Sequence, residues 1–295
     1  MSLKLEMAQV ARLAPKVLGN STSLVVDFFH SQQQEDGGFP DRAGRSDLYY
    51  TVFGIEGLIA LQQPIPTDRL YRYVKSFGDG ADLDLVHLSC LARCWSSLPV
   101  SLQHDCPRAE ILARLPAHRT PDGGFESALN QTAGSIYASF MAVGAYQDVK
   151  EPIPDEDRLL DFIESLRDPR AGFRTSLALP MSVVPVTSGA VALLRHLNRR
   201  TVDPGIADWL LSCFDAQGGF RPAPDAPLPD LLSTATALHA LSSMKVEIGQ
   251  AGELCLDFID TLWTNSGGFY GHWEDTHVDV EYTYYALLAL GHLAL

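Results

Sequence analysis

Asp36-Gly37-Gly38-Phe39 is the first of several related glycine–phenylalanine motifs in this chain of 295 residues. The later copies are Asp122-Gly123-Gly124-Phe125, Ala171-Gly172-Phe173, Gln217-Gly218-Gly219-Phe220 and Ser266-Gly267-Gly268-Phe269. The last three phenylalanines lie just under fifty residues apart, whereas the first two are separated by about twice that distance. A fixed period of this size is typical of a repeat architecture. We therefore expect one degenerate copy between the first two motifs.

Each motif separates two predicted helices of different character. The helix before the glycines is amphipathic, as in residues 159–166, where apolar residues recur at helical spacing with charged residues between them. The helix after the loop is apolar nearly all round, which predicts burial on all sides. We expect outer helices at 24–30, 69–76, 108–115, 159–166, 206–214 and 254–263, and inner helices at 51–61, 136–146, 187–197, 233–241 and 282–293.

The degenerate copy is expected between Tyr71 and Leu98, with Phe77-Gly78-Asp79-Gly80 as its loop and an inner helix beginning near Asp82. Glycine in these loops supplies the positive φ that ends a helix at little steric cost. The phenylalanine is then free to anchor the loop between neighbouring helical pairs.

Six helical pairs of this kind predict an all-α fold, an (α/α)6 toroid, which is a closed barrel of six helical hairpins. The alternative is an open solenoid, as in tetratricopeptide arrays, whose repeats are shorter, at about 34 residues, and need polar terminal caps. The last predicted helix, 284–295, is apolar to its end, which favours closure onto the first repeat. We expect a single domain over 1–295, with six repeats from about residue 21 and residues 1–20 as an extra N-terminal helix capping the outside.

The net charge of −14 argues against nucleic-acid binding, which needs a basic footprint. No apolar run approaches the roughly 20 residues that span a bilayer, and no secretory signal is evident. Five scattered cysteines, among them Cys90 and Cys94 on one predicted helix face, indicate reduced thiols and a cytoplasmic location. We expect these two cysteines to be small buried hydrophobic residues.

The stretches 37–44 (Gly-Gly-Phe-Pro-Asp-Arg-Ala-Gly) and 47–58 (Asp-Leu-Tyr-Tyr-Thr-Val-Phe-Gly-Ile-Glu-Gly-Leu) carry a family resemblance. Together with the repeats, they resemble the β subunits of protein prenyltransferases, especially the Rab geranylgeranyl type, and more distantly the squalene–hopene cyclases. The resemblance implies a toroid with a central aromatic cavity for an isoprenoid. It also implies a zinc ion at the cavity mouth, held by Asp, Cys and His, that activates a substrate thiolate. Enzymes of that family work with an α subunit, and the sequence leaves any partner subunit open.

The ligand pattern of the family can be placed on this chain in two registers. Counting repeats in order puts Asp230, Leu232 and Tyr282 in the aspartate, cysteine and histidine positions. The best local match treats the ring as circularly shifted and puts Asp279, Glu281 and Tyr50 there. Neither register supplies a cysteine or a histidine, so this chain departs from the family at its zinc ligands.

The segment 271–281 leads into the last inner helix and contains His277, Asp279 and Glu281. With Asp47 from the facing repeat, these residues are candidate ligands for a divalent metal, because imidazole and carboxylate groups suit zinc, iron or manganese. The metal would be zinc by family resemblance. The alternative is an acidic helix N-terminus, which the helix dipole favours.

Asp82-Leu83-Asp84-Leu85 partly matches the Asp-x-Asp-Asp acid of cyclases that protonate a double bond. The third carboxylate is replaced by Leu85, and helix capping is again the alternative. His87 follows one turn after Asp84, where the two side chains can pair on the helix surface. The candidate catalytic residues are therefore Asp84, Asp279 and Glu281.

Four arginines follow glycine turns and are candidates for bidentate binding of a diphosphate, with solvated loop charges as the alternative: Arg42, Arg45, Arg174 and Arg221. Aromatic residues on the predicted inner helices are candidates for the cavity wall, and about half of them should be simple core: Tyr49, Tyr50, Phe53, Tyr137, Phe140, Tyr282, Tyr284 and Tyr285.

The leading hypothesis is a prenyltransferase-β-like protein that binds an isoprenoid diphosphate or similar lipid in its central cavity, with prenyl transfer as the associated reaction and a degenerate zinc site. One alternative is a terpene-cyclase-like enzyme in which Asp82 and Asp84 act as the acid. The other is a non-catalytic binding or scaffold module that kept the ring and lost the metal.

Overall fold

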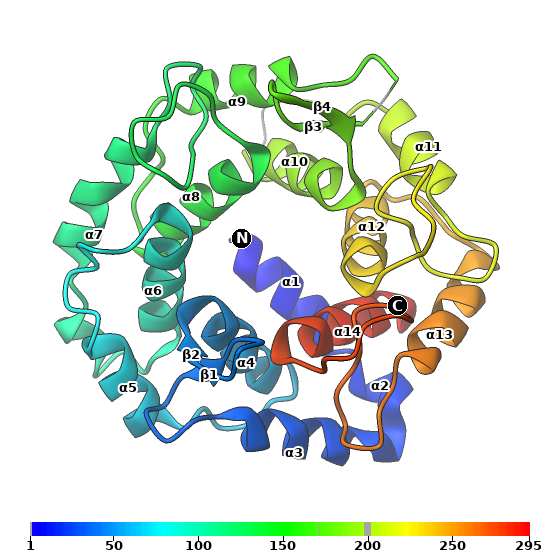
Figure 1. Ribbon diagram of the computed structural model, residues 1–295, viewed down its shortest axis with the longest axis horizontal. Helices are drawn as coiled ribbons and strands as arrows, with labels where there is room; N and C mark the ends of the chain where they lie inside the picture. Colours follow the sequence, from blue (N-terminus) through cyan, green and yellow to red (C-terminus); the bar gives the residue numbers. More distant parts are fainter. Residues whose placement is uncertain (1, 171, 198–201) are drawn as a thin grey trace.

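The computed structural model describes residues 2–170, 172–197 and 202–295, so that Ala171, the first residue of the third motif, lies outside the described residues. The helices form two concentric rings (Figure 1). The inner ring consists of α4 (Leu48–Ala60), α6 (Leu85–Ser97), α8 (Ile136–Asp148), α10 (Val184–His196), α12 (Leu231–Ser243) and α14 (Val280–Leu293). The outer ring consists of α3 (Thr22–Gln32), α5 (Thr67–Lys75), α7 (Arg108–Arg114), α9 (Glu156–Ser165), α11 (Gly205–Ser212) and α13 (Ala251–Thr261). The predicted all-α toroid is confirmed.

The two rings differ in burial as the sequence pattern predicts. The outer helix α9 buries Leu159, Leu160, Phe162 and Ile163 along one face. The inner helix α14 is buried over most of its length, including Tyr284 and the run from Ala286 to Gly291. The degenerate repeat is also present, because α5 and α6 flank the loop at 77–80. Outer helices therefore pack on one side only, whereas inner helices pack against the outer ring and against each other.

The ring closes at the junction of α14 and α4. Helix α14 packs against α12 of the preceding repeat and also against α4 of the first repeat. The remaining inner helices pack in the same way on their neighbours around the circle. The inner helix of the last repeat therefore has a neighbour on each side, and the open solenoid is excluded.

The glycine–phenylalanine motifs fasten each loop to the inner helix that follows it. Gly218 has a φ of +97°, and a Cβ atom there would lie 2.1 Å from the carbonyl oxygen of Leu254, so only glycine fits. In the last repeat the backbone N–H of Phe269 donates to the hydroxyl of Thr283 at 3.2 Å. The same bond joins each other motif to the helix after it: Phe39 to Thr51, Phe125 to Ser139, Phe173 to Thr187 and Phe220 to Thr234.

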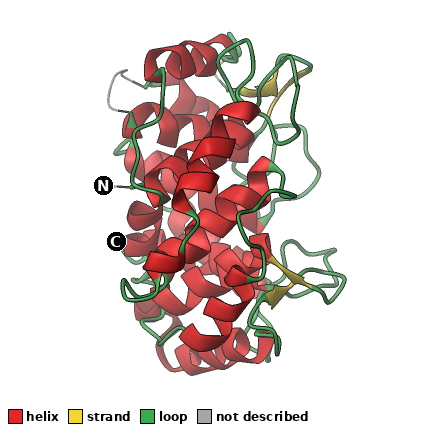
Figure 2. Cartoon of the chain, turned by 90° about the vertical axis from the view of Figure 1, so that its left-hand side faces the viewer, coloured by secondary structure: helices red, strands yellow, loops and turns green. Residues whose placement is uncertain are grey.

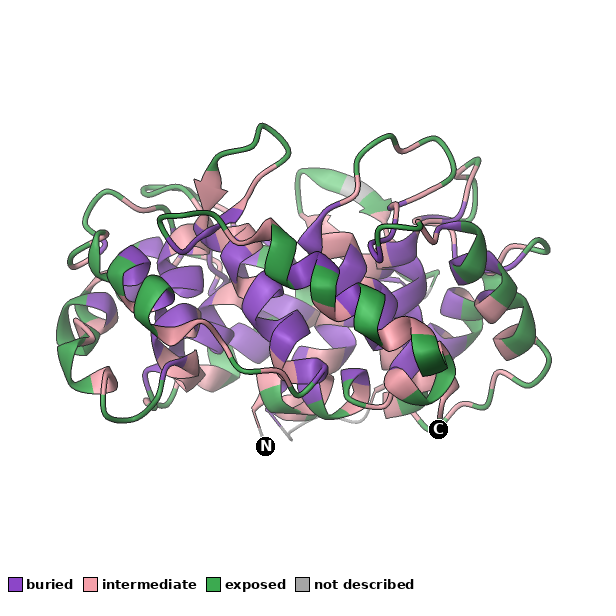
Figure 3. Cartoon of the chain, turned by 90° about the horizontal axis from the view of Figure 1, so that it is seen from below, coloured by how far each residue is buried: buried purple, intermediate pink, exposed green. Residues whose placement is uncertain are grey.

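The motif loops all lie on one face of the ring, which we call the loop rim (Figure 2). Two antiparallel hairpins stand there, β1 (Phe39–Pro40) with β2 (Ser46–Asp47), and β3 (Arg174–Ser176) with β4 (Leu179–Ser182). Short 3₁₀ turns η1 (Gly19–Ser21), η2 (Gln103–Asp105) and η3 (Leu115–His118) complete the described elements. Both chain ends lie on the opposite face (Figure 3).

The N-terminal segment was wrongly expected to cap the outside of the ring. It forms α1 (Leu3–Ala11) and the short α2 (Pro15–Leu18), and α1 lies across the central opening (Figure 1). There α1 packs on α14 and α4. Leu3 and Met7 of α1 therefore face the interior of the toroid, whereas Leu5 is exposed. In the part of the chain that the structure describes, no helix combines the length and the apolar character needed to cross a membrane.

Candidate functional site

An apolar cavity of about 180 Å³ lies at the centre of the ring, and a second cavity of about 110 Å³ adjoins it. Both are lined by Met7, Tyr49, Tyr137, Phe140 and Tyr285, so we treat them as two lobes of one central cavity. Tyr137 is 43% exposed although it lies inside the ring, because its side chain borders this empty space.

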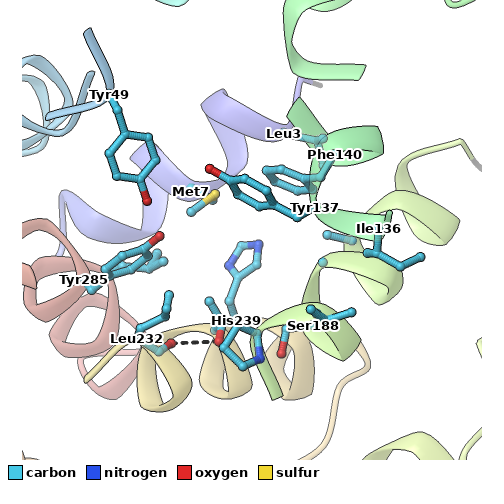
Figure 4. A pocket seen from close by; sticks show the side chains of 16 residues that line it. Leu3, Met7, Tyr49, Ile136, Tyr137, Phe140, Ser188, Leu232, His239 and Tyr285 are labelled. Atoms are coloured by element: carbon cyan, nitrogen blue, oxygen red, sulfur yellow. Dashed lines mark hydrogen bonds between the residues drawn. The ribbon is translucent and has the colours of Figure 1, made fainter. Parts of the chain in front are cut away.

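Most of the predicted aromatic wall is present. Tyr49, Tyr137, Phe140 and Tyr285 line both lobes, and Figure 4 shows the three tyrosine rings arranged around the same space. Phe53 and Tyr284 line only the smaller lobe. Tyr50 and Tyr282 line neither lobe. Six of the eight aromatic residues named from the sequence therefore line the cavity, more than the expected half, and Tyr50 and Tyr282 lie elsewhere.

Aspartate caps fix the first turns of the helices that carry the site. The side chain of Asp47 accepts hydrogen bonds from the backbone N–H groups of Tyr49 and Tyr50, at 2.8 and 3.2 Å. Asp279 caps α14 in the same way through Tyr282, at 2.9 Å. Such caps satisfy backbone donors that a helix leaves unpaired at its start. Asp47 and Asp279 therefore cap helices, in line with the alternative of an acidic helix N-terminus.

Glu281 and Tyr49 form a partly buried polar pair, in which Tyr49 lines the cavity. The hydroxyl of Tyr49 donates a hydrogen bond of 2.6 Å to Oε1 of Glu281. Burial raises the pKa of Glu281 to about 7, and the neighbouring Asp279 adds to the effect, whereas Tyr49 and Arg42 oppose it. A carboxyl group with this pKa exchanges its proton near neutral pH, which is the property that a general acid requires.

Arg42 connects the first repeat to the last across the ring junction. Its guanidinium contacts Asp275 at 2.8 Å and Asp279 at 2.9 Å, and lies 5.2 Å from the centre of the Tyr282 ring. Burial raises the pKa of Asp279, although Arg42 opposes this. Arg42, predicted to hold a diphosphate, is thus already paired with two carboxylates.

The other three predicted diphosphate residues are distributed around the loop rim. Arg45 is largely exposed and contacts Asp41 at 3.3 Å. Arg221, in the fifth repeat, lies 3.5 Å from Asp215. Arg174 belongs to β3 of the fourth repeat. The four arginines therefore come from three different repeats, and at least three of them have carboxylate partners.

The predicted metal ligands each point to a different partner. Glu281 contacts Tyr49, Asp279 contacts Arg42, Asp47 contacts His87 at 3.2 Å, and His277 contacts the hydroxyl of Thr276 at 3.1 Å. Among the residues that the structure describes, no group of three or more His, Cys, Asp or Glu side chains could hold a metal ion. The described side chains therefore do not fit the zinc site that the resemblance implies.

Asp84 is held as an ionised group at the loop rim. It caps α6 and pairs with His87 at 2.8 Å, as the spacing predicted, and the same imidazole reaches Asp47. The hydrogen bond with Asp47 is the main cause that raises the pKa of His87 to about 9. Burial favours a higher pKa for Asp84, but its bonds with His87 outweigh this and hold the pKa below the usual value. Asp84 therefore lacks the protonated form that the cyclase hypothesis assigned to it.

Many lining residues were not identified from the sequence, among them two residues of α1 and one histidine. Leu3 and Met7 of α1 border the cavity, and no local pattern marks a helix that will cross the ring. His239 also lines the larger lobe, and its Nδ1 lies 2.9 Å from Nε2 of His292. Burial lowers the pKa of both imidazoles, to about 3 for His292, so this pair is neutral. Two histidines on different inner helices gave no sequence signal of their pairing.

Comparison with known proteins identifies the repeats. The family model for the prenyltransferase alpha-alpha toroid domain matches residues 19–89, 83–179 and 178–294. A search of curated proteins finds no match.

Solved structures share the architecture at low sequence identity. A variant of the type II terpene cyclase MstE from Scytonema, in complex with geranylgeranyl dihydroxybenzoate, is 13% identical with a TM-score of 0.65, covering 95% of this chain and 97% of the cyclase. The protein geranylgeranyltransferase-I of Candida albicans complexed with GGPP is 12% identical with a TM-score of 0.52, covering 76% and 90%. An inactive α-1,6-mannanase variant from Salegentibacter, in complex with α-1,6-mannotriose, is 10% identical with a TM-score of 0.63, covering 98% and 99%. These similarities show a common fold and leave function to be argued from the site.

Proposed function

This chain belongs to the prenyltransferase alpha-alpha toroid family, and from that premise we propose that it binds an isoprenoid lipid in its central cavity. The observation that carries the proposal is the lining of the cavity, which is mostly apolar and aromatic, with a few hydroxyl and imidazole groups and, in the smaller lobe, the ion pair of Glu56 and Arg93. Pockets of this kind gain affinity from apolar burial and use a few polar groups to orient the ligand.

The lining favours an isoprenoid over a sugar, although both kinds of ligand occur in toroids of this fold. Leu3, Val186 and Leu288 offer no hydrogen bonds to a sugar ring. The hydroxyl of Thr236 is already committed to the carbonyl of Leu232 at 2.7 Å. Sugar hydroxyls placed against these side chains would lose their bonds to water without replacement, which is unfavourable. A branched hydrocarbon chain has no such groups to desolvate.

A neutral head group fits the surroundings better than a diphosphate. Arg42 would have to leave Asp275 and Asp279 to bind a phosphate, and these two carboxylates would then be unpaired. The net charge of −14 also opposes an anionic ligand. We infer that the Glu281–Tyr49 pair receives the polar end of an uncharged isoprenoid.

Isothermal titration calorimetry with geranylgeraniol and geranylgeranyl diphosphate tests this proposal. We expect saturable one-to-one binding, tighter for the alcohol. Tyr285→Ala should weaken binding at least about tenfold, because it removes a ring that lines both lobes. Tyr71→Ala, on the outer helix α5 and away from the cavity, is the matched control. If neither ligand binds, or if both variants behave alike, the proposal is wrong.

Glu281 favours proton-initiated cyclisation as a second candidate function. With Glu281 protonated, the hydrogen bond to Tyr49 would reverse, so that the carboxyl group donates its proton to the Tyr49 oxygen. The Tyr49 hydroxyl proton would pass to a carbon of a substrate double bond, forming a C–H bond and leaving a carbocation. A neighbouring double bond would then close a ring through a new C–C bond. Return of a proton to the carboxylate would form the final alkene, so the overall reaction is an isomerisation. The surrounding tyrosine rings would stabilise the cation.

Product analysis after incubation with geranylgeraniol distinguishes this second function from binding alone. We expect a cyclic isomer from the wild-type protein, and none from Glu281→Gln, which keeps the shape of the side chain but has no acidic proton. Product formation should also decline above about pH 7, as Glu281 loses its proton. If the protein binds geranylgeraniol but forms no product, it is a carrier and the cyclase function is wrong.

A further inference from the structure

Helix α1 forms the closed end of the central cavity. Leu3 and Met7 are the residues of α1 that line the larger lobe, and Met7 also lines the smaller one. Figure 4 shows Met7 on the α1 ribbon behind the three tyrosine rings. We call Leu3 and Met7 the cavity floor.

The cavity extends along the inner helices, from the side of the loop rim to the cavity floor. Each inner helix begins directly after a loop of the loop rim, so Tyr49 and Leu232 in the first turns lie on the side of the loop rim. His239, seven residues beyond Leu232 on α12, lines the same lobe about 10 Å deeper at the rise of an α-helix. A chain that enters beside Glu281 therefore meets the α1 floor at its far end.

Several polar contacts hold α1 in this position. The backbone N–H of Leu3 donates to the side chain of Gln147 at 3.0 Å. The ammonium group of Lys4 donates to Ser97 at 2.5 Å and to Ser96 at 3.3 Å. Lys4 is thereby fixed to α6, and Leu3 to α8. These hydrogen bonds fix the position of α1 and therefore of the cavity floor.

A close backbone contact fixes the other end of α1. A Cβ atom on Gly291 of α14 would lie only 2.1 Å from the carbonyl oxygen of Val10. Glycine thus allows the two helices to touch at the backbone. The contact sets how deeply α1 sits in the ring.

The floor is separate from the part of the chain that matches the family. The family model begins at residue 19, whereas α1 covers Leu3–Ala11. The walls of the cavity are therefore built from the matched repeats, and the floor comes from a segment outside them.

We propose that Met7 is a specificity-determining residue that sets the length of the apolar chain accepted by the cavity. This inference rests on the proposed isoprenoid binding. A chain that is too long has to leave apolar carbons in water or displace α1, and each CH₂ left unburied weakens binding about fourfold. A thioether side chain at the floor also adapts its shape to the end of a branched chain.

Calorimetry with geraniol, farnesol, geranylgeraniol and geranylfarnesol tests the floor. Met7→Ala should shift the preferred alcohol to one that is an isoprene unit longer, changing the ratio of the two dissociation constants at least about tenfold. Met7→Phe should shift the preference toward a shorter alcohol. Met244→Ala, a partly buried methionine outside the cavity lining, is the matched control and should keep the wild-type preference.

The same titrations with decanol, hexadecanol and eicosanol separate this inference from the proposed function. If the protein binds straight-chain alcohols but no isoprenoid, the proposed function fails, while the length shift in the Met7 variants still supports the floor. If the variants bind with unchanged length preference, the floor inference is wrong and isoprenoid binding stands. If neither series binds, both are wrong.

Discussion

Glu281 has the most distinctive chemical environment of the residues predicted from the sequence. It was predicted as a metal ligand and a catalytic residue, and the structure pairs it with Tyr49. The two residues are at opposite ends of the chain and meet because the ring closes. Sequence spacing identifies the acidic residues that lead into α14, whereas their actual partners depend on the neighbouring repeat.

The high pKa of Glu281 predicts a specific dependence of stability on pH. Its pKa rises from an ordinary value of 4.5 to about 7 in the folded protein, so between these values the folded state binds more protons than the unfolded state. The free energy of unfolding should therefore fall as the pH rises through this window. Glu281→Gln should not show this fall. The free energy of unfolding of the variant, relative to that of the wild type, should therefore increase by on the order of 2 kcal/mol between about pH 5 and about pH 8.

Urea unfolding of the wild type and Glu281→Gln at several pH values measures this difference. Glu253→Gln, on the exposed side of α13, is the control for losing one negative charge. Parallel stability curves for wild type and Glu281→Gln across the whole range would show that Glu281 titrates normally.

At the scale of elements, the helical pairs follow from local patterns. Apolar spacing, glycine turns and aspartate caps place the inner and outer helices within a few residues of their observed bounds. The degenerate α5–α6 pair is found by counting the period rather than by its own motif. Helix α1 is different, because its polar anchors Gln147 and Ser97 are far away in the sequence. No local pattern specifies whether such a helix lies outside the ring or inside it.

Gly291 provides a test of how α1 is seated. Gly291→Ala forces a methyl group against the Val10 carbonyl, and we expect a loss of about 1–3 kcal/mol in stability. Residues 3–11 should also become more accessible to protease. Gly252→Ala in α13 is the control, since the nearest atoms lie 3.6 Å away and alanine favours a helix by up to about 1 kcal/mol. Equal stability of the two variants would mean that α1 is not held against α14.

At the scale of the whole molecule, ring closure is the feature from which the site follows. The apolar last helix predicted closure, and α14 does pack against α4. The sequence could not resolve which junction corresponds to the family's catalytic centre. Asp230 and Asp279 both cap inner helices, so the two registers place the same kind of residue at neighbouring junctions. Because the repeats are alike, the sequence predicts the fold. For the same reason it does not show which junction between repeats corresponds to the family's catalytic centre.

Arg42 tests how strongly the first and last repeats are joined. Arg42→Ala leaves the buried carboxylates of Asp275 and Asp279 without their cation, and we expect a loss of about 1–3 kcal/mol in chemical denaturation. Arg45→Ala removes an exposed arginine from the same loop and should cost no more than about 0.5 kcal/mol. Similar effects of the two substitutions would contradict a stabilising role for Arg42 at the junction.

The central claim is that the ring encloses a binding site for an isoprenoid chain. The most direct measurement is a crystal structure of the protein grown with geranylgeraniol. We expect the hydrocarbon chain to lie among Tyr49, Tyr137 and Tyr285, with its far end against Met7. A cavity that stays empty, or a ligand bound only on the outer surface, would contradict the claim.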